Sequence, residues 1–250
     1  MPTVVVTGAT GAIGSATVAA LVKRRVQVVS LSRPALDLSS MTSVRAAARE
    51  VNRTVRHIDA LLNIAAMYST TYRKNGDAIE LMLATNHLGP FLLTNLLRDH
   101  LSGGGRVITV TAPSGTHVDI DRLLDRERFS AVHSFGATKA ANLMFTFELA
   151  RRASRWDVRA NAFHPGLVRS ELMRETSRSV RLVTRLISSK PERAAHDLVD
   201  LALSPAHAGT TGWFFKGTRQ IDAPKSTLDT DQQGELWKRS AELVELENGF

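Results

Sequence analysis

Three regularly spaced glycines near the start of the chain constrain its fold more than any other feature. Gly8, Gly11 and Gly14 follow an apolar run beginning at Val4, which predicts a buried strand, and precede apolar positions at helical spacing beyond Ile13. Such glycines permit a tight turn and let the backbone approach a pyrophosphate, which the helix N-terminus stabilises. The pattern predicts a nucleotide-binding loop, with a plain tight turn as the alternative. The residues expected to hold the pyrophosphate are Gly8, Thr10, Gly11, Ala12, Ile13 and Gly14.

Beyond this loop, short β-branched runs alternate with longer amphipathic stretches. The alternation predicts an α/β fold, a Rossmann-like doubly wound parallel sheet with helices on both faces. No repeat or low-complexity linker interrupts the 250 residues, so a single domain over 1–250 is expected. The expected strands are Thr3–Thr7, Val26–Leu31, Ala60–Ile64, Arg106–Val110, Val158–Phe163 and Trp213–Phe215. The expected helices are Ile13–Lys23, Thr42–Arg53, Ala78–His100, Thr138–Ser154, Pro191–Leu203 and Asp231–Leu246.

The connection after the second expected strand is unusually short. Only the residues from Ser32 to Met41 separate that strand from the next expected helix. A full doubly wound fold inserts a helix and a further strand at this point. The segment has room for a short edge strand around Ala35–Leu38 and little else, so we expect the adenine-side edge of the sheet to be trimmed.

Composition excludes several classes of function. The chain has no cysteine, which rules out disulfides, a thiolate nucleophile and a Cys-ligated metal, and we expect no metal site. Its formal charge is +8, yet the basic residues are scattered among acids and form no recognition motif, so nucleic-acid binding is not expected. No apolar run is long enough to span a membrane, and the sequence begins without a secretory leader. A cytoplasmic protein that acts on a small molecule is expected.

The glycine spacing is the form used by the short-chain dehydrogenase/reductases, and other motifs extend this resemblance over nearly the whole chain. The segment 85–94 reads TNHLGPFLLT, and 161–166 reads NAFHPG. With 143–152 and 236–240, they are similar to motifs of the branch that contains retinol dehydrogenases and protochlorophyllide reductases. The resemblance implies a Rossmann-like fold and an oxidoreductase that uses a nicotinamide cofactor.

The residue after the second strand bears on which cofactor is used. A carboxylate there would bind a ribose 2′-hydroxyl, whereas this chain has Arg33, whose guanidinium can bind a 2′-phosphate in a bidentate manner. An arginine that merely covers the strand end is the alternative. We predict NADP(H). The resemblance implies further cofactor contacts near the adenine, the ribose and the nicotinamide, at Asp37, Leu38, Asn63, Ala65, Lys139, Pro165, Gly166 and Val168.

The catalytic positions depart from the family pattern. The resemblance places a proton-donating tyrosine at position 135, a lysine that lowers its pKa at Lys139, and a helix-kinking asparagine at Asn86. Here position 135 is Phe135, whose ring carries no proton to donate. The family's substrate-binding serine aligns with Ala112. Thr111 or Ser114 could supply that hydroxyl if the loop shifts.

Four explanations fit these changes. The chain could reduce its substrate with a non-tyrosine proton source: Lys139, water, a phenol of the substrate itself, Ser134, or one of the histidines His133 and His117. It could run a redox-neutral reaction such as cyclisation, isomerisation or dehydration. It could be a non-catalytic NADP-binding sensor or scaffold, or an engineered inactive variant. We favour NADPH-dependent reduction of a carbonyl or related unsaturated group on a bulky, mostly apolar metabolite, for example an aromatic polycyclic one from secondary metabolism.

Two surface features complete the prediction. The stretch from Leu167 to Lys190 alternates apolar positions with arginines, which predicts one or two amphipathic helices. They would form either a lid over the substrate pocket or a solvated helix face. The resemblance also implies a homodimer or homotetramer formed through the helices around 78–100 and 138–154, both of which are rich in apolar residues. The arginines of the stretch are Arg169, Arg174, Arg178, Arg181 and Arg185.

Overall fold

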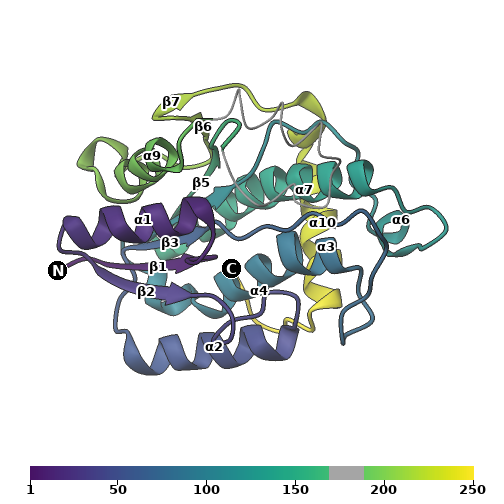
Figure 1. Ribbon diagram of the computed structural model, residues 1–250, viewed down its shortest axis with the longest axis horizontal. Helices are drawn as coiled ribbons and strands as arrows, with labels where there is room; N and C mark the ends of the chain where they lie inside the picture. The colour runs from purple at the N-terminus through teal and green to yellow at the C-terminus, as the bar shows by residue number, and fades with distance from the viewer. Residues whose placement is uncertain (169–188) are drawn as a thin grey trace.

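A computed structural model describes residues 1–168 and 189–250. Their strands form a single sheet in the order β2-β1-β3-β4-β5-β6-β7, in which β1 to β6 run parallel and β7 pairs antiparallel with β6 (Figure 1). This architecture confirms the predicted Rossmann-like sheet. The strands are β1 (Thr3–Thr7), β2 (Gln27–Leu31), β3 (Ala60–Asn63), β4 (Arg106–Val110), β5 (Arg159–His164), β6 (Phe214–Lys216) and β7 (Arg219–Gln220).

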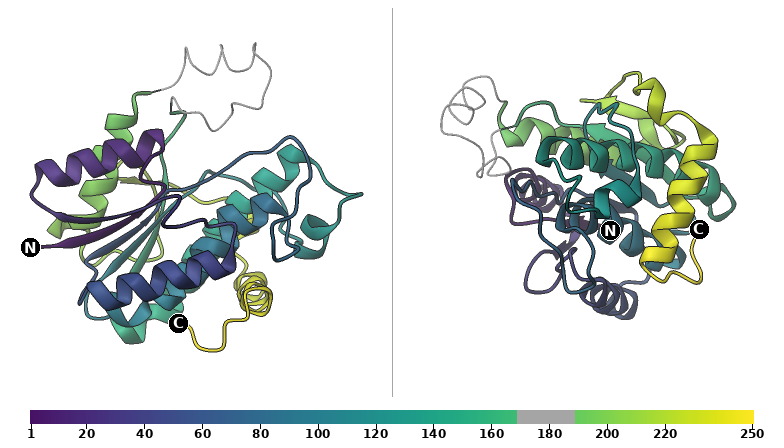
Figure 2. Two further views of the ribbon diagram at one scale, coloured as in Figure 1. Left: turned by 60° about the horizontal axis from the view of Figure 1, so that its bottom comes forward. Right: turned by 90° about the vertical axis from the view of Figure 1, so that its right-hand side faces the viewer.

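Helices cover both faces of the sheet. One face carries α1 and α9, and the other carries α2, α4 and α7 (Figure 2). No helix in the described ranges is long and apolar enough to cross a membrane. The helices are α1 (Ala12–Lys23), α2 (Met41–Thr54), α3 (Leu81–Leu83), the π-helix η1 (Ala84–Leu88), α4 (Gly89–Leu96), α5 (Arg98–Leu101), α6 (Ile120–Leu124), α7 (Ala131–Arg152), α9 (Pro191–Leu203) and α10 (Thr230–Leu243), with short 3-10 turns at Ala153–Trp156, Pro205–His207 and Lys225–Thr227.

The sheet ends at β2, so its adenine-side edge is trimmed as predicted. The expected edge strand at Ala35–Leu38 is wrong, because this segment turns instead of extending. The Leu36 N–H donates to the Ser32 carbonyl oxygen over 3.0 Å, and Pro34 has no N–H to give to a ladder. The chain therefore passes from β2 through a compact turn directly into α2.

Two expected helices differ from the observed ones by more than one helical turn. The helix expected over 78–100 is divided into α3, η1, α4 and α5, so the backbone is not regular around Asn86. Helix α7 begins at Ala131, seven residues before the expected start at Thr138. The polar and glycine-containing sequence before Thr138 gave no apolar periodicity, but the turn packs on the loop after β4, where Thr116 contacts Gly136. Phe135 consequently lies inside the helix.

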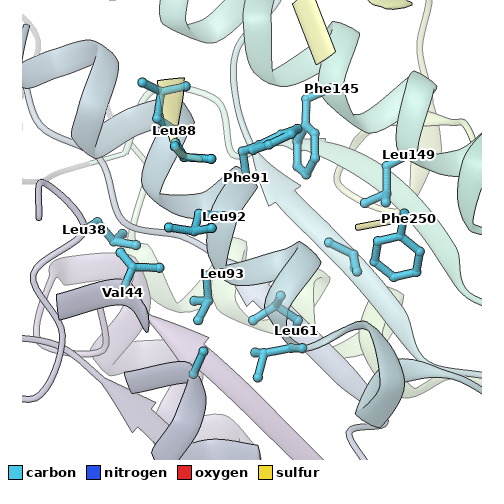
Figure 3. Close-up of a cluster of buried hydrophobic side chains, with 14 of the residues drawn as sticks. Leu38, Val44, Leu61, Leu88, Phe91, Leu92, Leu93, Phe145, Leu149 and Phe250 are labelled. Atoms are coloured by element: carbon cyan, nitrogen blue, oxygen red, sulfur yellow. The ribbon is translucent and has the colours of Figure 1, made fainter. Parts of the chain in front are cut away.

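The helices expected to form an oligomer interface are covered within the chain. Helix α10 packs on α7, and Trp237 lies 4.9 Å from Phe91 and 5.8 Å from Phe145, measured between ring centroids. The C-terminal Phe250 packs edge-on against Trp156 and joins the same apolar cluster as Phe91 and Phe145 (Figure 3). Much of their apolar surface is thus used inside the fold, and the homodimer or homotetramer stays a prediction.

His87 is buried within this cluster, and its titration makes the stability of the fold depend on pH. Its ring nitrogens form hydrogen bonds with Asn142 and Ser240 at 3.2 and 2.9 Å, and its ring packs against Phe91 and Phe145. Burial lowers the pKa of His87 to about 4 from 6.5. Between these two values the unfolded chain binds a proton that the folded chain does not, so folding stability falls as the pH drops through this window.

We therefore expect the free energy of unfolding, measured from urea transitions, to fall by up to roughly 3 kcal/mol across that window because of His87. Replacing His87 with glutamine should reduce this pH dependence, although it lowers stability at neutral pH. Replacing the exposed His57 with glutamine is the matched control and should leave the dependence unchanged. A His87→Gln protein with the wild-type pH dependence would contradict the assignment.

Candidate functional site

The glycine loop has no room for a side chain at two of its positions. Gly8 has a φ of +66°, and its N–H donates to the Leu31 carbonyl oxygen over 2.9 Å. A Cβ atom on Gly14 would lie 2.1 Å from the Gly8 carbonyl oxygen, and one on Gly8 would lie 2.8 Å from Cα of Ala65. The loop after β1 therefore packs directly on the loop after β3, in a conformation that glycine alone adopts without strain.

Helix α1 begins at this loop with free backbone donors. Gly11 precedes the helix without a side-chain cap, and the first turn holds no acidic residue. Thr10 and Gly11 are exposed, and Ala12 and Ile13 are partly exposed. An uncapped helix start of this kind binds phosphate through its N–H groups and its dipole. The structure brings the six predicted loop residues together around it.

The adenine-side residues lie in the turn after β2. Arg33 is exposed there and forms no ion pair within the described residues. Asp37 accepts hydrogen bonds from the Ser39 N–H and hydroxyl at 2.9 and 2.7 Å. Burial acts to raise the pKa of Asp37, but these bonds and the charge of Arg33 outweigh it and lower the pKa. Asp37 is thus engaged in its own turn, Leu38 is buried beneath it, and Arg33 is free to meet an anion.

The end of β3 supports the glycine loop. The Thr7 hydroxyl accepts hydrogen bonds from the N–H groups of Ile64 and Ala65 at 3.0 and 3.3 Å. Asn63 is buried and donates to the Thr94 hydroxyl at 3.1 Å, while its Oδ1 has no hydrogen-bond partner among the described residues. A buried acceptor of this kind is costly unless a donor reaches it. Asn63 and Ala65 lie at the same carboxyl edge of the sheet as Gly8.

The predicted nicotinamide segment follows β5 at the same edge. Gly166 has a φ of +73°, and Val168 forms a parallel bridge with Ser189. Pro165 and Val168 are partly buried. The predicted lid falls mostly in 169–188, including all five arginines named above, and so lies outside the described residues.

Phe135 and Lys139 face each other across one turn of α7. The Lys139 ammonium nitrogen lies 5.2 Å from the centroid of the Phe135 ring, a cation–π contact. The Lys139 side chain is only 6% exposed, and burial lowers its pKa to about 8. Its ammonium has no hydrogen bond or ion pair with any residue in the described ranges. A single unpaired cation thus lies beside the position of the missing acid.

Asn86 joins two parts of the site. Its Oδ1 accepts from the Met67 N–H at 2.7 Å, and its Nδ2 donates to the Met67 carbonyl oxygen at 2.9 Å and to the Thr138 hydroxyl at 3.2 Å. The Thr138 hydroxyl in turn donates to the Phe135 carbonyl oxygen at 2.8 Å. Asn86 sits in the π-helix η1, a distortion that often marks functional sites. It holds the loop after β3 against α7.

The two hydroxyls considered as serine replacements are placed differently. Thr111 is buried and donates to the Lys139 carbonyl oxygen at 2.7 Å, which commits it to holding α7 on β4. The partly exposed Ser114 donates to the Thr116 hydroxyl at 3.0 Å. A Cβ atom on Gly136 would lie 2.5 Å from Oγ1 of Thr116 and 3.3 Å from Oγ of Ser114. Ser114 and Thr116 therefore adjoin the turn that carries Phe135. The sequence pattern did not indicate Thr116.

The histidines near the site are poor proton donors at neutral pH. Burial, with the nearby charges of Arg122 and His117, lowers the pKa of His133. Burial and Lys216 likewise lower the pKa of His164, whose Nδ1 has no hydrogen-bond partner among the described residues. A lowered pKa leaves each imidazole neutral near pH 7, which weakens the case for His133 as the missing acid.

Sequence reasoning missed Tyr68. Its ring meets the ring of Phe135 edge to face, with centroids 5.5 Å apart and an interplanar angle of 81°. The chain has only two tyrosines, and the other, Tyr72, donates its hydroxyl to the Leu124 carbonyl oxygen at 2.6 Å. Tyr68 follows Met67, at the end of the segment that Asn86 holds. The one available signal in the sequence was that Tyr68 lies a few residues after the predicted cofactor contacts Asn63 and Ala65.

Comparison with known proteins shows the family. The short chain dehydrogenase profile matches residues 31–181. Human retinol dehydrogenase 13 is 31% identical over 98% of this chain and 85% of its own length. A Streptomyces protein named as a daunorubicin C-13 ketoreductase is 32% identical over 97% of this chain and 92% of its own. The chain belongs to the short-chain dehydrogenase/reductase family.

Coverage differs among these relatives. Human retinol dehydrogenase 14 is 33% identical over 84% of this chain, but the match spans 66% of that protein. Among solved structures, an uncharacterized protein from Mycobacterium paratuberculosis superposes with a TM-score of 0.78 at 26% identity, covering 100% of this chain and 96% of the other. A 3-alpha-hydroxysteroid dehydrogenase from Pseudomonas has a TM-score of 0.72 at 19% identity, covering 86% and 95%, and shows the shared fold.

Proposed function

We propose that this chain is a reductase that uses NADPH to reduce a carbonyl or related unsaturated group on a bulky, mostly apolar metabolite. One observation carries the proposal: a tightly packed glycine loop and an unpaired buried lysine lie at the same edge of the sheet. Gly14 against Gly8 shapes the loop, and Lys139 supplies a cation beside the partly exposed ring of Phe135. We take 1–250 as a single NADP(H)-binding domain.

The residues present fit a nicotinamide dinucleotide phosphate. The loop and the start of α1 would hold its pyrophosphate, Arg33 its 2′-phosphate, and Lys139 the nicotinamide ribose hydroxyls. The Asp37 carboxylate is engaged by the Ser39 N–H and hydroxyl, and the positive charge of Arg33 lies near enough to lower its pKa. When bound, NADPH supplies a hydride, and the chain's own residues must orient the carbonyl and provide the proton.

The substrate class is inferred from the relatives and from two partly exposed aromatic rings at the site. The names of the relatives pair oxidoreductase activity with retinol and with daunorubicin, both of them large organic molecules. In this chain the partly exposed rings of Phe135 and Tyr68 offer an apolar contact surface. Orientation alone can lower a barrier by about 7–11 kcal/mol, so activated ketones and quinones should be reduced even with a weak proton source.

The proposal is tested by mixing the purified protein with NADPH and a panel of all-trans-retinal, daunorubicin and phenanthrenequinone. Loss of NADPH absorbance together with an alcohol or hydroquinone product supports the reductase. Conversion of a substrate without consumption of NADPH would instead support redox-neutral chemistry. This is the second candidate because the family's Tyr and Ser positions are both replaced, by Phe135 and Ala112. Tight NADPH binding without any product would point to a sensor.

Cofactor choice is tested at Arg33. Removing its guanidinium in Arg33→Ala should weaken NADPH binding by roughly 10- to 100-fold, because a charge-assisted hydrogen bond is worth about 1.5–3 kcal/mol. NADH binding should change little. Binding is followed through the fluorescence of the reduced cofactor, with Arg56→Ala in the exposed bend after α2 as the matched control. Equal losses for NADH and NADPH would overturn the assignment of Arg33 to the 2′-phosphate.

A further inference from the structure

We propose that Tyr68 supplies the catalytic proton that position 135 cannot, an inference that rests on the proposed reductase function. The edge-to-face contact between the two rings places a phenol immediately beside the family's tyrosine position. The phenol comes from the loop after β3 instead of from α7. The pair Tyr68 and Phe135 therefore places one phenol and one phenyl ring in contact at this site.

The backbone that carries Tyr68 is held in register with α7. Asn86 forms two hydrogen bonds to the backbone of Met67, the preceding residue, and one to Thr138, which bonds the Phe135 carbonyl oxygen. Position 69 is also fixed, since the Ser69 side chain is fully buried. Fixed supports of this kind hold an acid in the geometry that proton transfer needs. Asn86 is thus a positioning residue for Tyr68.

The Tyr68 hydroxyl is available to a substrate. Within the described residues it has no hydrogen-bond partner, and its side chain is partly exposed, whereas the Tyr72 hydroxyl is taken by Leu124. Lys139 and Tyr68 both contact the Phe135 ring, so the ammonium and the phenol belong to the same cluster of side chains.

In the proposed step the carbonyl group receives a hydride from the nicotinamide and a proton from Tyr68. With the hydride going to the carbonyl carbon, the carbonyl C=O π bond breaks and the Tyr68 O–H bond gives its proton to the oxygen. The ketone or quinone carbonyl is reduced by two electrons, the nicotinamide is oxidised by two, and water returns a proton to the phenolate. The hydroxyls of Ser114 and Thr116 adjoin Gly136, next to Phe135, and would hold the carbonyl oxygen during the transfer.

The decisive variant is Tyr68→Phe, assayed with NADPH and phenanthrenequinone beside the wild type. We expect kcat to fall roughly 10²- to 10⁴-fold, as the loss of a general acid does, with NADPH affinity unchanged. Tyr72→Phe is the matched control, because it removes the other phenol of the chain without touching the site. Adding Phe135→Tyr to Tyr68→Phe should restore much of the rate by returning the phenol to α7.

A second readout does not depend on turnover. In the presence of NADP⁺, the lactam phenanthridinone should bind Tyr68→Phe roughly 2- to 10-fold more weakly by calorimetry, for want of one hydrogen bond to its carbonyl oxygen. Wild-type kcat and lactam affinity in Tyr68→Phe would overturn the proposal and leave the reductase function standing. If neither the wild type nor Phe135→Tyr reduces any of the panel, the reductase function fails and the role of Tyr68 fails with it.

Discussion

A Gly14→Ala protein is expected to bind NADPH roughly 5- to 150-fold more weakly than the wild type. The added Cβ atom would lie 2.1 Å from the Gly8 carbonyl oxygen and 3.0 Å from Cα of Ala9. Both neighbours are backbone atoms, so the glycine loop must open to admit a methyl group. Overpacking of this kind costs about 1–3 kcal/mol, and an opened loop no longer presents its N–H groups to a pyrophosphate. Fluorescence titration with NADPH and a thermal melt measure the two effects.

Two other glycines calibrate this result. A Cβ atom on Gly11 would meet the same Gly8 oxygen at 3.3 Å, so Gly11→Ala should weaken binding less than Gly14→Ala. Gly234 lies inside α10 with nothing within 4 Å of an added Cβ atom, and Gly234→Ala should stabilise the fold by about 0.5–1 kcal/mol without changing NADPH affinity. A Gly14→Ala protein that binds NADPH like the wild type would show that the loop does not form the cofactor site.

Much of the fold followed from local patterns. The glycine loop and the alternation of runs predicted the parallel sheet, and the ten-residue gap after Leu31 predicted its trimmed edge. The division of the 78–100 helix did not follow, because a π-helix at Asn86 depends on bonds to Met67 and Thr138, which are distant in sequence. The early start of α7 was hidden for a similar reason, since its first turns are set by contacts with the loop after β4.

Candidate site residues that belong to a family motif could be predicted from the sequence. Those that join the site only through tertiary contacts could not. The residues assigned from family positions, such as Asn86 and Lys139, do converge on one edge of the sheet. Tyr68 belongs to no motif, and the loop after β3 meets α7 only once the sheet has formed. The sequence also did not show that the apolar faces of α4 and α7 are covered within the chain. No local pattern indicates that α10 and Phe250 pack on them.

Lys139→Met is expected to give a more stable protein that reduces poorly. Burial lowers the pKa of Lys139 from 10.5 to about 8. Below pH 8 the side chain is an ammonium in both states, and it is less favourable in the folded state because it is removed from water there. Between these values the unfolded state binds more protons, and stability therefore rises with pH through this window. The shift corresponds to roughly 3 kcal/mol at neutral pH, part of which the contact with Phe135 already offsets.

Methionine has a similar length and no charge to desolvate, so Lys139→Met should raise the free energy of unfolding at neutral pH by about 1–3 kcal/mol. The rise in stability between pH 8 and 10.5 should disappear from its urea transitions. Reduction should fall by at least roughly 10²-fold, because the ammonium proposed to hold the nicotinamide ribose in place is gone. Lys238→Met, at an exposed position on α10, removes the same charge and should change neither stability nor rate. A Lys139→Met protein less stable than the wild type would mean that the ammonium is paired in solution, and that its charge is not held ready for a ligand.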